Sequence, residues 1–415
     1  MSKRNTTYAN PFRPGAGHRP PYLAGRKDEV TEFKRLLGQK IILENMVLTG
    51  LRGVGKTVLL EDFKTLAIQN GWLWVGTDLT EAASLSDERI ALRLLADLSV
   101  ATASFSVGEL AGASHLGFHG KAEQAKLDFQ TLSSVYAGTP GLVSDKLKSV
   151  LELVWRVIKA KSKGIIFAYD EAQNLSDHSG DKEFPLSLML DVFQSLQRRD
   201  IPFMLVLTGL PTLFPKLVEA RTFAERMFRV VTLDRLEDSD SREAITRPIR
   251  AAKCPVSISA EAVEEIVRET AGYPYFIQYF CREVFDIFLQ QLALGTEPQT
   301  IPTASITKKQ DTDFFAGRWA RITDRQRDLL VVIARLIARV KDSDGEFAVQ
   351  DIVVESVPAN KAGNIDKPFN TSHVSQLLSA LCEIGLVYKN RHGRYSFAVP
   401  LMDRFILRQI GGSFE

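Results

Sequence analysis

Two short segments carry the residue types that phosphate chemistry needs. Residues 50–57 read Gly-Leu-Arg-Gly-Val-Gly-Lys-Thr and match the pattern G-x-x-x-x-G-K-[ST]. Glycines at these places let backbone amides wrap a phosphate closely, and a helix N-terminus behind them adds its positive dipole end. Lys56 adds a point charge at the β- and γ-phosphates, and Thr57 is a ligand for Mg²⁺. The segment predicts a nucleotide site made of Gly50, Arg52, Gly53, Val54, Gly55, Lys56, Thr57 and Val58.

The second segment, residues 165–171, reads Ile-Ile-Phe-Ala-Tyr-Asp-Glu, an apolar run that ends in two adjacent acids. Downstream of a phosphate loop, Asp170 is expected to hold Mg²⁺ through water and Glu171 to polarise the attacking water. Acids also mark the solvent-exposed ends of many strands, which is the alternative interpretation. The pair of segments favours the catalytic one. The predicted cofactors are therefore ATP and Mg²⁺, with Thr57 and Asp170 as the metal residues and hydrolysis as the reaction.

The elements that must position these residues alternate along the chain. We expect strands at 46–49, 72–77, 165–169, 203–208 and 228–233, and helices at 28–37, 56–70, 87–98, 143–161 and 184–199. Strands that alternate with helices of this length indicate a parallel sheet covered on both faces. Residues 101–141 interrupt the pattern and form an expected insertion, either a hairpin of 104–107 with 115–119 or a disordered segment. His115 and His119 have no acid or cysteine cluster beside them, so no metal site is expected there.

The rest of the chain predicts further domains. Helical spacing at 239–251, 259–270 and 275–294 indicates a helical domain, 235–295, after a core at 22–234. A polar linker with two prolines is expected at 296–307, and an extended arm at 1–21, which contains four prolines. The 415 residues carry a net charge of +2 and three isolated cysteines, which fits a reducing cytoplasm. No apolar run reaches the roughly 20 residues of a membrane span, and no signal peptide is expected.

The C-terminal segment, 308–415, has helical spacing at 323–334, 349–354 and 371–385, then two strand-like runs at 386–389 and 394–398. This order resembles a winged helix, in which the third helix enters the major groove and basic wing residues touch phosphate. The implied contacts to duplex DNA are Thr371, Ser372, His373, Ser375 and Gln376 on the helix, and Lys389, Arg391, His392 and Arg394 on the wing. Further phosphate contacts are expected from Arg318, Arg321, Arg325, Arg327, Arg335, Arg339 and Lys341. The alternatives are a protein-contact domain and a merely solvated Arg/Asp helix face.

The segments GLRGVGKT, IIFAYDEAQ, VLTGLP and TFAERMF together resemble AAA+ ATPases, in the branch of archaeal-type ATPases, origin-recognition initiators and signal-transduction (STAND) ATPases. The resemblance covers roughly residues 20–300. It implies a P-loop AAA+ parallel sheet sandwiched by helices, with Walker A and Walker B segments, a helical lid and a winged-helix domain.

The resemblance also implies roles for single residues. Gly25 and Arg26 match a box beside the nucleotide base, Thr208 the sensor-1 position, and Pro274 the G-x-P turn of the lid. Arg226 matches the arginine finger, with Arg221 and Arg229 as competitors. The chain departs from the family after the turn, where Tyr275-Phe-Ile-Gln278 stands and no sensor-2 arginine is found.

The expected protein is a cytoplasmic, slow Mg²⁺-dependent ATPase that assembles into homo-oligomers when ATP binds. Its nucleotide state is expected to control DNA binding or assembly through the winged helix. A STAND-like signalling or defence ATPase, whose winged helix contacts a protein partner, is the alternative. The basic helix and wing favour the DNA-controlling ATPase, and the lid without a sensor-2 arginine favours the signalling ATPase.

Overall fold

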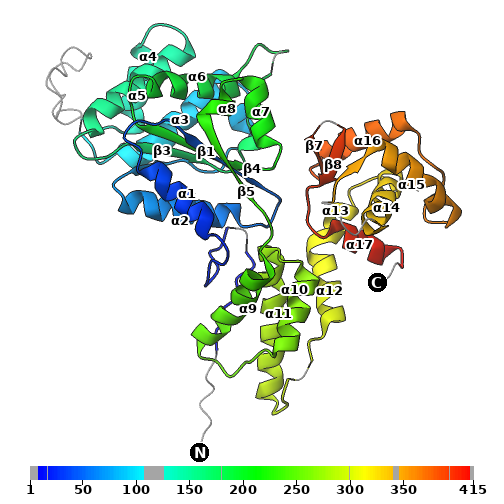
Figure 1. Cartoon of the computed structure of the whole chain (residues 1–415). Helices are drawn as coiled ribbons and strands as arrows, with labels where there is room; N and C mark the ends of the chain where they lie inside the picture. The colour runs from blue at the N-terminus through cyan, green and yellow to red at the C-terminus, as the bar shows by residue number, and fades with distance from the viewer. Residues whose placement is uncertain are drawn as a thin grey trace, which may run out of the picture. The chain divides into compact units, whose positions relative to one another are not determined.

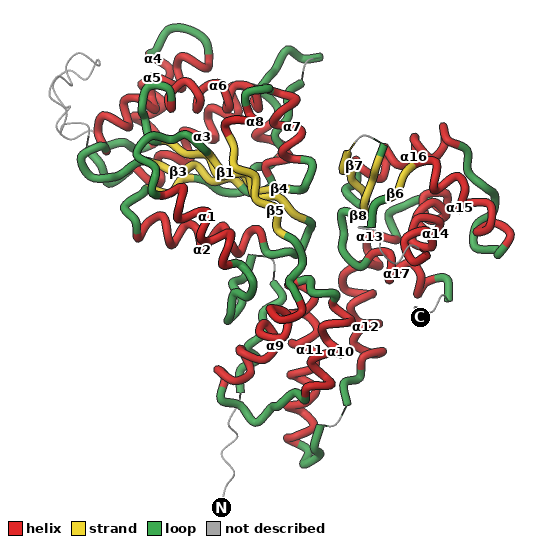
Figure 2. The backbone as a smooth tube through the Cα atoms, in the orientation of Figure 1, coloured by secondary structure: helices red, strands yellow, loops and turns green. Residues whose placement is uncertain are grey.

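The chain was analysed as a computed structural model that describes residues 8–15, 17–106, 126–178, 180–298, 300–339, 345–391 and 393–411. It divides into two compact units. The sheet unit comprises 26–50 and 56–233, and the C-terminal unit comprises 1–25, 51–55 and 234–415. Figures 1 and 2 draw the elements of both units.

The sheet unit is built on five parallel strands: β1 (Asn45–Gly50), β2 (Leu73–Val75), β3 (Ile165–Tyr169), β4 (Phe203–Gly209) and β5 (Phe228–Leu233). Their order in the sheet is β2-β3-β4-β1-β5. Every residue of β1, β3 and β4 is buried, which is why these strands read as unbroken apolar runs. The carboxyl ends of β3, β4 and β1 therefore meet at one edge of the sheet.

Helices cover both faces of this sheet. α1 (Lys27–Leu37) and α2 (Lys56–Gln69) lie on one face, and α3 (Asp87–Thr102), α5 (Val143–Ile158) and α6 (Pro185–Gln197) on the other (Figure 1). α4 (Phe129–Gly138) packs on α3 and α5, while α7 (Leu213–Ala220) and α8 (Ala224–Met227) lead into β5. Two short 3-10 turns, η1 (Glu81–Ser84) and η5 (Ala172–Asn174), follow β2 and β3.

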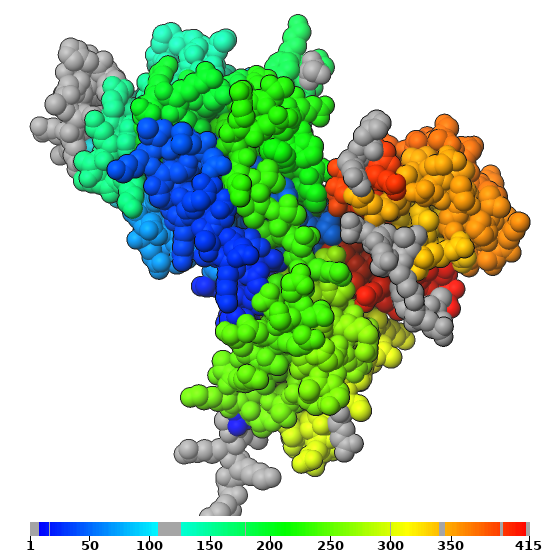
Figure 3. All heavy atoms as spheres, in the orientation of Figure 1, coloured from blue at the N-terminus to red at the C-terminus, as the bar shows by residue number. Residues whose placement is uncertain are grey.

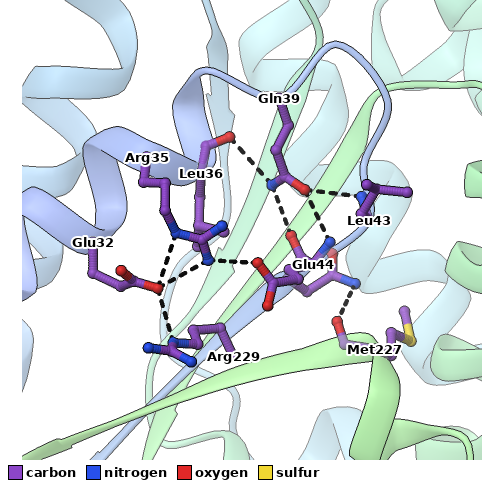
Figure 4. A network of polar contacts seen from close by, with 9 residues as sticks. Glu32, Arg35, Leu36, Gln39, Leu43, Glu44, Met227 and Arg229 are labelled. Carbon is purple, nitrogen blue, oxygen red and sulfur yellow. Dashed lines mark hydrogen bonds and ion pairs between the residues drawn. The ribbon is translucent and has the colours of Figure 1, made fainter.

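A polar network fastens α1 to the starts of β1 and β5 (Figure 4). Glu32 accepts from Arg35 at 2.9 Å and pairs with Arg229 at 2.8 Å, and Arg35 also contacts Glu44. Hydrogen bonds from Arg35, and the charge of Arg229, lower the pKa of Glu32. Gln39 closes the network by donating to the Glu44 carbonyl at 3.0 Å. In the space-filling view, the blue atoms of α1 accordingly border the green atoms that lead into β5 (Figure 3).

The C-terminal unit begins with the helices α9 (Asp238–Ala252), α10 (Ala260–Thr270) and α11 (Pro274–Ala293). The N-terminal arm packs against them, since Phe12 is buried in their apolar cluster and Asn10 donates to the Arg282 carbonyl at 3.0 Å. One aromatic side chain thus anchors the segment that the sequence predicts as an extended arm.

The second part of this unit combines helices with a small antiparallel sheet. α12 (Thr303–Gln310) continues through a π-helical turn, η6 (Asp311–Ala316), into α13 (Gly317–Trp319). Then follow α14 (Asp324–Arg339), β6 (Phe347–Ala348), α15 (Val349–Lys361), α16 (Thr371–Glu383), β7 (Val387–Arg391), β8 (Arg394–Phe397) and α17 (Met402–Gln409). The three strands pair in the order β6-β8-β7.

Two expectations about irregular segments need correction. Residues 101–141 are not uniformly irregular, since α3 runs on to Thr102 and α4 buries Leu132 and Tyr136 one helical turn apart. The hairpin expected at 104–107 and 115–119, with His115 and His119, lies largely outside the described residues; Ser106 instead bridges Lys126. The expected linker at 296–307 is partly helical, because α12 begins at Thr303. Pro302 precedes it. A proline has no backbone N–H to donate, and the start of a helix leaves such donors without a partner in any case.

No helix in the described ranges has the length and apolar character that crossing a membrane requires. The sequence analysis did not predict β6 and α17. β6 is two residues long, and α17 starts at Met402 after a non-glycine residue, Leu401, with positive φ.

Candidate active site

The loop between β1 and α2 has the backbone of a phosphate cradle. Gly53 and Gly55 adopt positive φ angles of 80° and 97°, a region that other residues enter at a cost. Lys56 is the first residue of α2, and its side chain is buried. Its Nζ donates to the carbonyl of Gly50 at 2.9 Å, so the ammonium group points back across the mouth of the loop.

Three of the predicted residues converge at the carboxyl end of β3. The buried carboxylate of Asp170 accepts from the Thr57 hydroxyl at 2.5 Å and from the hydroxyl of Thr208, the last residue but one of β4. The first residues of α2 are thereby joined to two adjacent strands of the sheet. The hydroxyl oxygen of Thr57 and the carboxylate oxygen of Asp170 that it contacts are oxygen ligands of the type that Mg²⁺ takes.

Glu171 follows Asp170 in a left-handed conformation, with φ of 50°, and its side chain is exposed. The backbone amide of Glu171 donates to the Asp170 carboxylate at 2.8 Å, which helps to hold the strained turn. Gln173 donates its amide to the Glu171 carboxylate and accepts from the backbone of Leu210 at 3.2 Å. Gln173 was missed by the sequence analysis, because only the fold of η5 brings it back toward Glu171.

A further acid, Asp78, lies beside this edge and was also missed. The segment after β2 pairs with the end of β3: Leu79 donates to the Asp170 carbonyl at 2.9 Å, and Asp78 and Asp170 form a parallel bridge. Burial, followed by the charges of Asp170 and Glu171, raises the pKa of Asp78, while Arg93 opposes the shift. The only signal in the sequence was an acid after an expected strand.

The carboxylates of Asp78, Asp170 and Glu171 do not by themselves form a metal site. In the described part of the chain, no three His, Cys, Asp or Glu side chains gather into a group that could hold a metal ion. Mg²⁺, however, is usually bound by one or two protein oxygens together with phosphates and water. The hydroxyl of Thr57 and the carboxylate of Asp170, in contact in this structure, fit that requirement.

Residues expected near the base and lid lie at tight backbone positions. Gly25 has φ of 59°, and a Cβ there would lie 2.7 Å from the Asp240 carboxylate. Arg26 is buried and pairs with Glu29 at 3.3 Å. Pro274 begins α11 directly after the Gly272 turn. Nothing in these contacts links Gly25 or Pro274 to a nucleotide.

The three candidate arginines, of which Arg229 lies within β5 and the other two precede it, differ in their partners. Arg221 makes two hydrogen bonds to Asp191, at 2.8 and 2.7 Å, and Arg229 pairs with Glu32 (Figure 4). Arg226 is exposed and makes no ion pair with any residue that the structure describes. It borders a cavity of about 440 Å³, which is also lined by Ile41, Leu43, Phe223 and Met227.

The candidate DNA-contacting residues lie on α16 and on the β7–β8 hairpin. Asn370 caps α16 by accepting from the amide of His373, whose ring lies 5.7 Å from that of Phe369. His373 is half-buried, and Lys389 is exposed. Arg394 pairs with Asp351 at 3.3 Å. Exposed polar side chains on α16 are those of Thr371, Ser372, Ser375 and Gln376. The Arg391 side chain, His392 and Lys341 lie outside what the structure describes.

The expected basic cluster around α14 is largely neutralised within the domain. Arg325 pairs with Asp328 and Arg327 with Asp324, while Arg335 and Arg339 share Glu355. Four of the arginines named from the sequence are therefore engaged with carboxylates. In the described residues, Arg318 and Arg321 have no such partner.

Solved structures identify the fold. The chain is similar to the Aeropyrum pernix ORC2 protein in its ADP form, at 12% identity and a TM-score of 0.53, covering 96% of this chain and 98% of that one. It also matches Cdc6p from Pyrobaculum aerophilum at 13% identity and a TM-score of 0.46, over 97% and 98% of the two chains. The predicted architecture, a parallel sheet sandwiched by helices and followed by a helical domain and a C-terminal domain, is confirmed, and the lid and winged-helix assignments stay predictions.

The sequence comparisons add one match. The family described as Domain of unknown function (DUF8462) covers residues 312–406, a range that spans η6 to α17. No curated protein sequence matches the chain.

The environment of Asp78 generates a prediction about pH. Because its pKa is raised in the folded state, ionisation of Asp78 opposes folding, and stability is lost as the pH rises from its unfolded pKa through its folded one. Asp78→Asn should therefore raise the melting temperature in metal-free buffer at about pH 7.5, and the gain should shrink toward pH 4.5. Thermal unfolding across this range measures it, with the exposed Asp181→Asn as control. A gain that is equal at all pH values would contradict the electrostatic cause.

Proposed function

We propose that this chain is a Mg²⁺-dependent ATPase that works as a nucleotide-controlled switch. The observation that carries the proposal is the convergence of Thr57 and Thr208 on the buried carboxylate of Asp170, beside a glycine-rich loop that opens α2. A protein of similar fold, the ORC2 protein, is known in an ADP form. Both observations support nucleotide as the ligand.

In this proposal the loop amides and the N-terminus of α2 bind the phosphates. Lys56 exchanges its hydrogen bond to the Gly50 carbonyl for one to phosphate oxygen. Mg²⁺, when bound, supplies positive charge to the phosphates, and Thr57 and Asp170 would hold it. Thr208 keeps the Asp170 carboxylate oriented. Gly25, Arg26 and Pro274 are proposed to flank the base.

Glu171 is the proposed general base. Its left-handed turn directs an exposed carboxylate away from the buried strand, where a water molecule has access to it. Gln173 holds that carboxylate from the side and is in turn fixed by the Leu210 amide. Glu171 thus has the support that a positioned base requires.

The first prediction separates binding from turnover. Lys56→Ala should weaken ATP binding beyond detection, because the phosphates lose their charged partner. Glu171→Gln should retain binding and lower turnover by about 10²–10⁴-fold, because only water activation is lost. Calorimetry with a non-hydrolysable ATP analogue and a phosphate-release assay measure the two effects. Lys64→Ala, an exposed lysine on the same helix, is the control. Tight ATP binding by the Lys56→Ala protein would refute the assignment.

Assembly is proposed to use the surface around Arg226. Of the three candidate arginines, it is the one without a carboxylate partner among the described residues, and so it is available to a neighbouring nucleotide. Ile41 and Leu43 beside it are 46% and 75% exposed, which leaves an apolar rim for a second copy to cover. The predicted arginine finger in trans is therefore proposed as Arg226.

This proposal is tested by complementation. Arg226→Ala should lower turnover by roughly 10³-fold, since a finger stabilises charge in the transition state. Mixing the Arg226→Ala and Lys56→Ala proteins should restore activity, because one supplies the nucleotide site and the other the arginine. Arg221→Ala, which breaks the pair with Asp191 and a hydrogen bond to the Ala220 carbonyl, should leave turnover intact. A protein that stays monomeric with ATP, and whose specific activity is independent of concentration, would exclude action in trans.

The C-terminal domain is proposed to be a winged helix that binds duplex DNA through the phosphate backbone. The order α14-β6-α15-α16-β7-β8 and the exposed polar start of α16 support this. The ion pairs that neutralise Arg325, Arg327, Arg335 and Arg339 favour the second candidate, a signalling ATPase whose domain contacts protein. Salt dependence distinguishes the two.

Removing Lys389, Arg391 and Arg394 together should flatten the slope of log affinity against log salt by about two to three units, close to one for each phosphate that is no longer neutralised. ATP hydrolysis should not change. Fluorescence anisotropy with the full chain and a labelled duplex, with and without ATP, measures it. The matched control replaces Lys34, Lys40 and Lys64 of the sheet unit by alanine. No affinity for duplex DNA at low salt would give first place to the protein-contact function.

A further inference from the structure

The first turn of α11 is in contact with the glycine-rich loop. The amide of Tyr275 donates to the carbonyl of Gly53 at 3.1 Å. A Cβ atom at Gly53 would lie 3.0 Å from that of Tyr275, so only glycine allows this approach without a shift. Both residues belong to the C-terminal unit. The lid helix is thus bonded to the loop by its backbone.

From Tyr275 the contacts continue to Arg318. The ring of Tyr275 lies 5.1 Å from that of Phe314 in η6. The guanidinium of Arg318 lies 4.5 Å above the ring of Phe314, and its Nη1 donates to the Phe314 carbonyl at 2.5 Å. Arg318 is therefore held in one place by a ring and a carbonyl, next to the helix turn that touches the loop.

The charged group that acts most strongly on Arg318 is the guanidinium of another arginine, Arg52. Burial first, and then the charges of Arg52 and Arg321, lower the pKa of Arg318, and no carboxylate acts on it. Arg52 is the third residue of the glycine-rich loop. The nearby acid Asp313 accepts from the Tyr279 hydroxyl at 2.8 Å and is engaged there. The described residues thus contain three neighbouring guanidinium groups with no anion among them.

Another arginine of the domain, Arg327, differs in this respect. Arg327 also lies over an aromatic ring, that of Trp319, yet it pairs with Asp324. Arg318 is partly buried while Arg52 and Arg321 are exposed, and like charges this close repel one another unless an anion joins them. Planar guanidinium groups bind phosphate oxygens in a bidentate manner. The loop that carries Arg52 is the one assigned above to phosphate binding.

We propose that Arg318, together with Arg52, binds a phosphate group of the nucleotide held by the glycine-rich loop. The proposal rests on the proposed function and adds to it a residue outside the sheet unit and outside the lid helices. Since Arg318 lies in α13, immediately before α14, the nucleotide gains a direct contact with the segment that enters the C-terminal domain. The turn at Gly385 also borders Arg52, since a Cβ there would lie 3.1 Å from its Nη2.

The test is calorimetry of the full chain with ATP, ADP and AMP. Arg318→Ala should weaken ATP binding by about tenfold or more, the usual effect of removing a hydrogen bond to a charged group, and AMP binding far less. Arg318→Lys should recover part of this affinity, because it restores the charge without the fork. Arg327→Ala is the matched control, an arginine on a ring that already has its carboxylate. It should bind ATP like the wild type.

Two further measurements separate the outcomes. The melting temperature without nucleotide should not fall in Arg318→Ala, since a repelled charge is removed; a fall that matches the decrease in affinity would mean a purely structural role and overturn the proposal. Normal ATP binding by Arg318→Ala, with binding abolished in Lys56→Ala, would also overturn it while leaving the ATPase assignment standing. Absence of ATP binding in the wild type would instead refute the proposed function. Unchanged ATP binding with weakened duplex-DNA binding would assign the cluster to DNA and reject the proposal.

Discussion

The carboxylate of Asp170 is the point on which the rest of the structure depends. A buried carboxylate is costly unless its oxygens are satisfied, and here the hydroxyls of Thr57 and Thr208 and the amide of Glu171 supply the hydrogen bonds. These partners come from α2, β4 and the turn after β3. The site exists because the sheet order places β3 beside β4 and one strand away from β1, whose loop leads into α2.

Features that depend on residues close together in the sequence could be predicted, and features that depend on residues far apart could not. The unbroken apolar runs of β3 and β4, and the glycine-rich loop, are local signals. The apolar runs predicted buried strands, and the loop predicted the positions of the candidate phosphate site. Asp78 and Gln173 reach the site through strand pairing and a tight turn, which no local pattern encodes. Arg318 is brought toward Arg52 by packing between segments more than 250 positions apart.

The prediction from sequence differs most from the structure in which arginines are available to bind a partner. The sequence offers Arg226 as the finger with two competing arginines, and seven basic residues near α14. Ion pairs make them unequal: Asp191 and Glu32 engage Arg221 and Arg229, and a single buried acid, Glu355, serves both Arg335 and Arg339. Counting charges overestimates the positive surface, because the carboxylate partner of an ion-paired arginine cancels much of its field. Which arginines remain open is a property of the fold.

The anchoring of Phe12 among the lid helices has a consequence for how the chain is made. Asn10 and its partner Arg282 are separated by 272 positions, so the arm leaves the ribosome long before its binding surface exists. At a synthesis rate of about 5–20 residues per second, the delay is roughly 14–54 s. During that time the aromatic side chain has no native partner. Folding of α9, α10 and α11 must therefore capture a segment that was synthesised well before them.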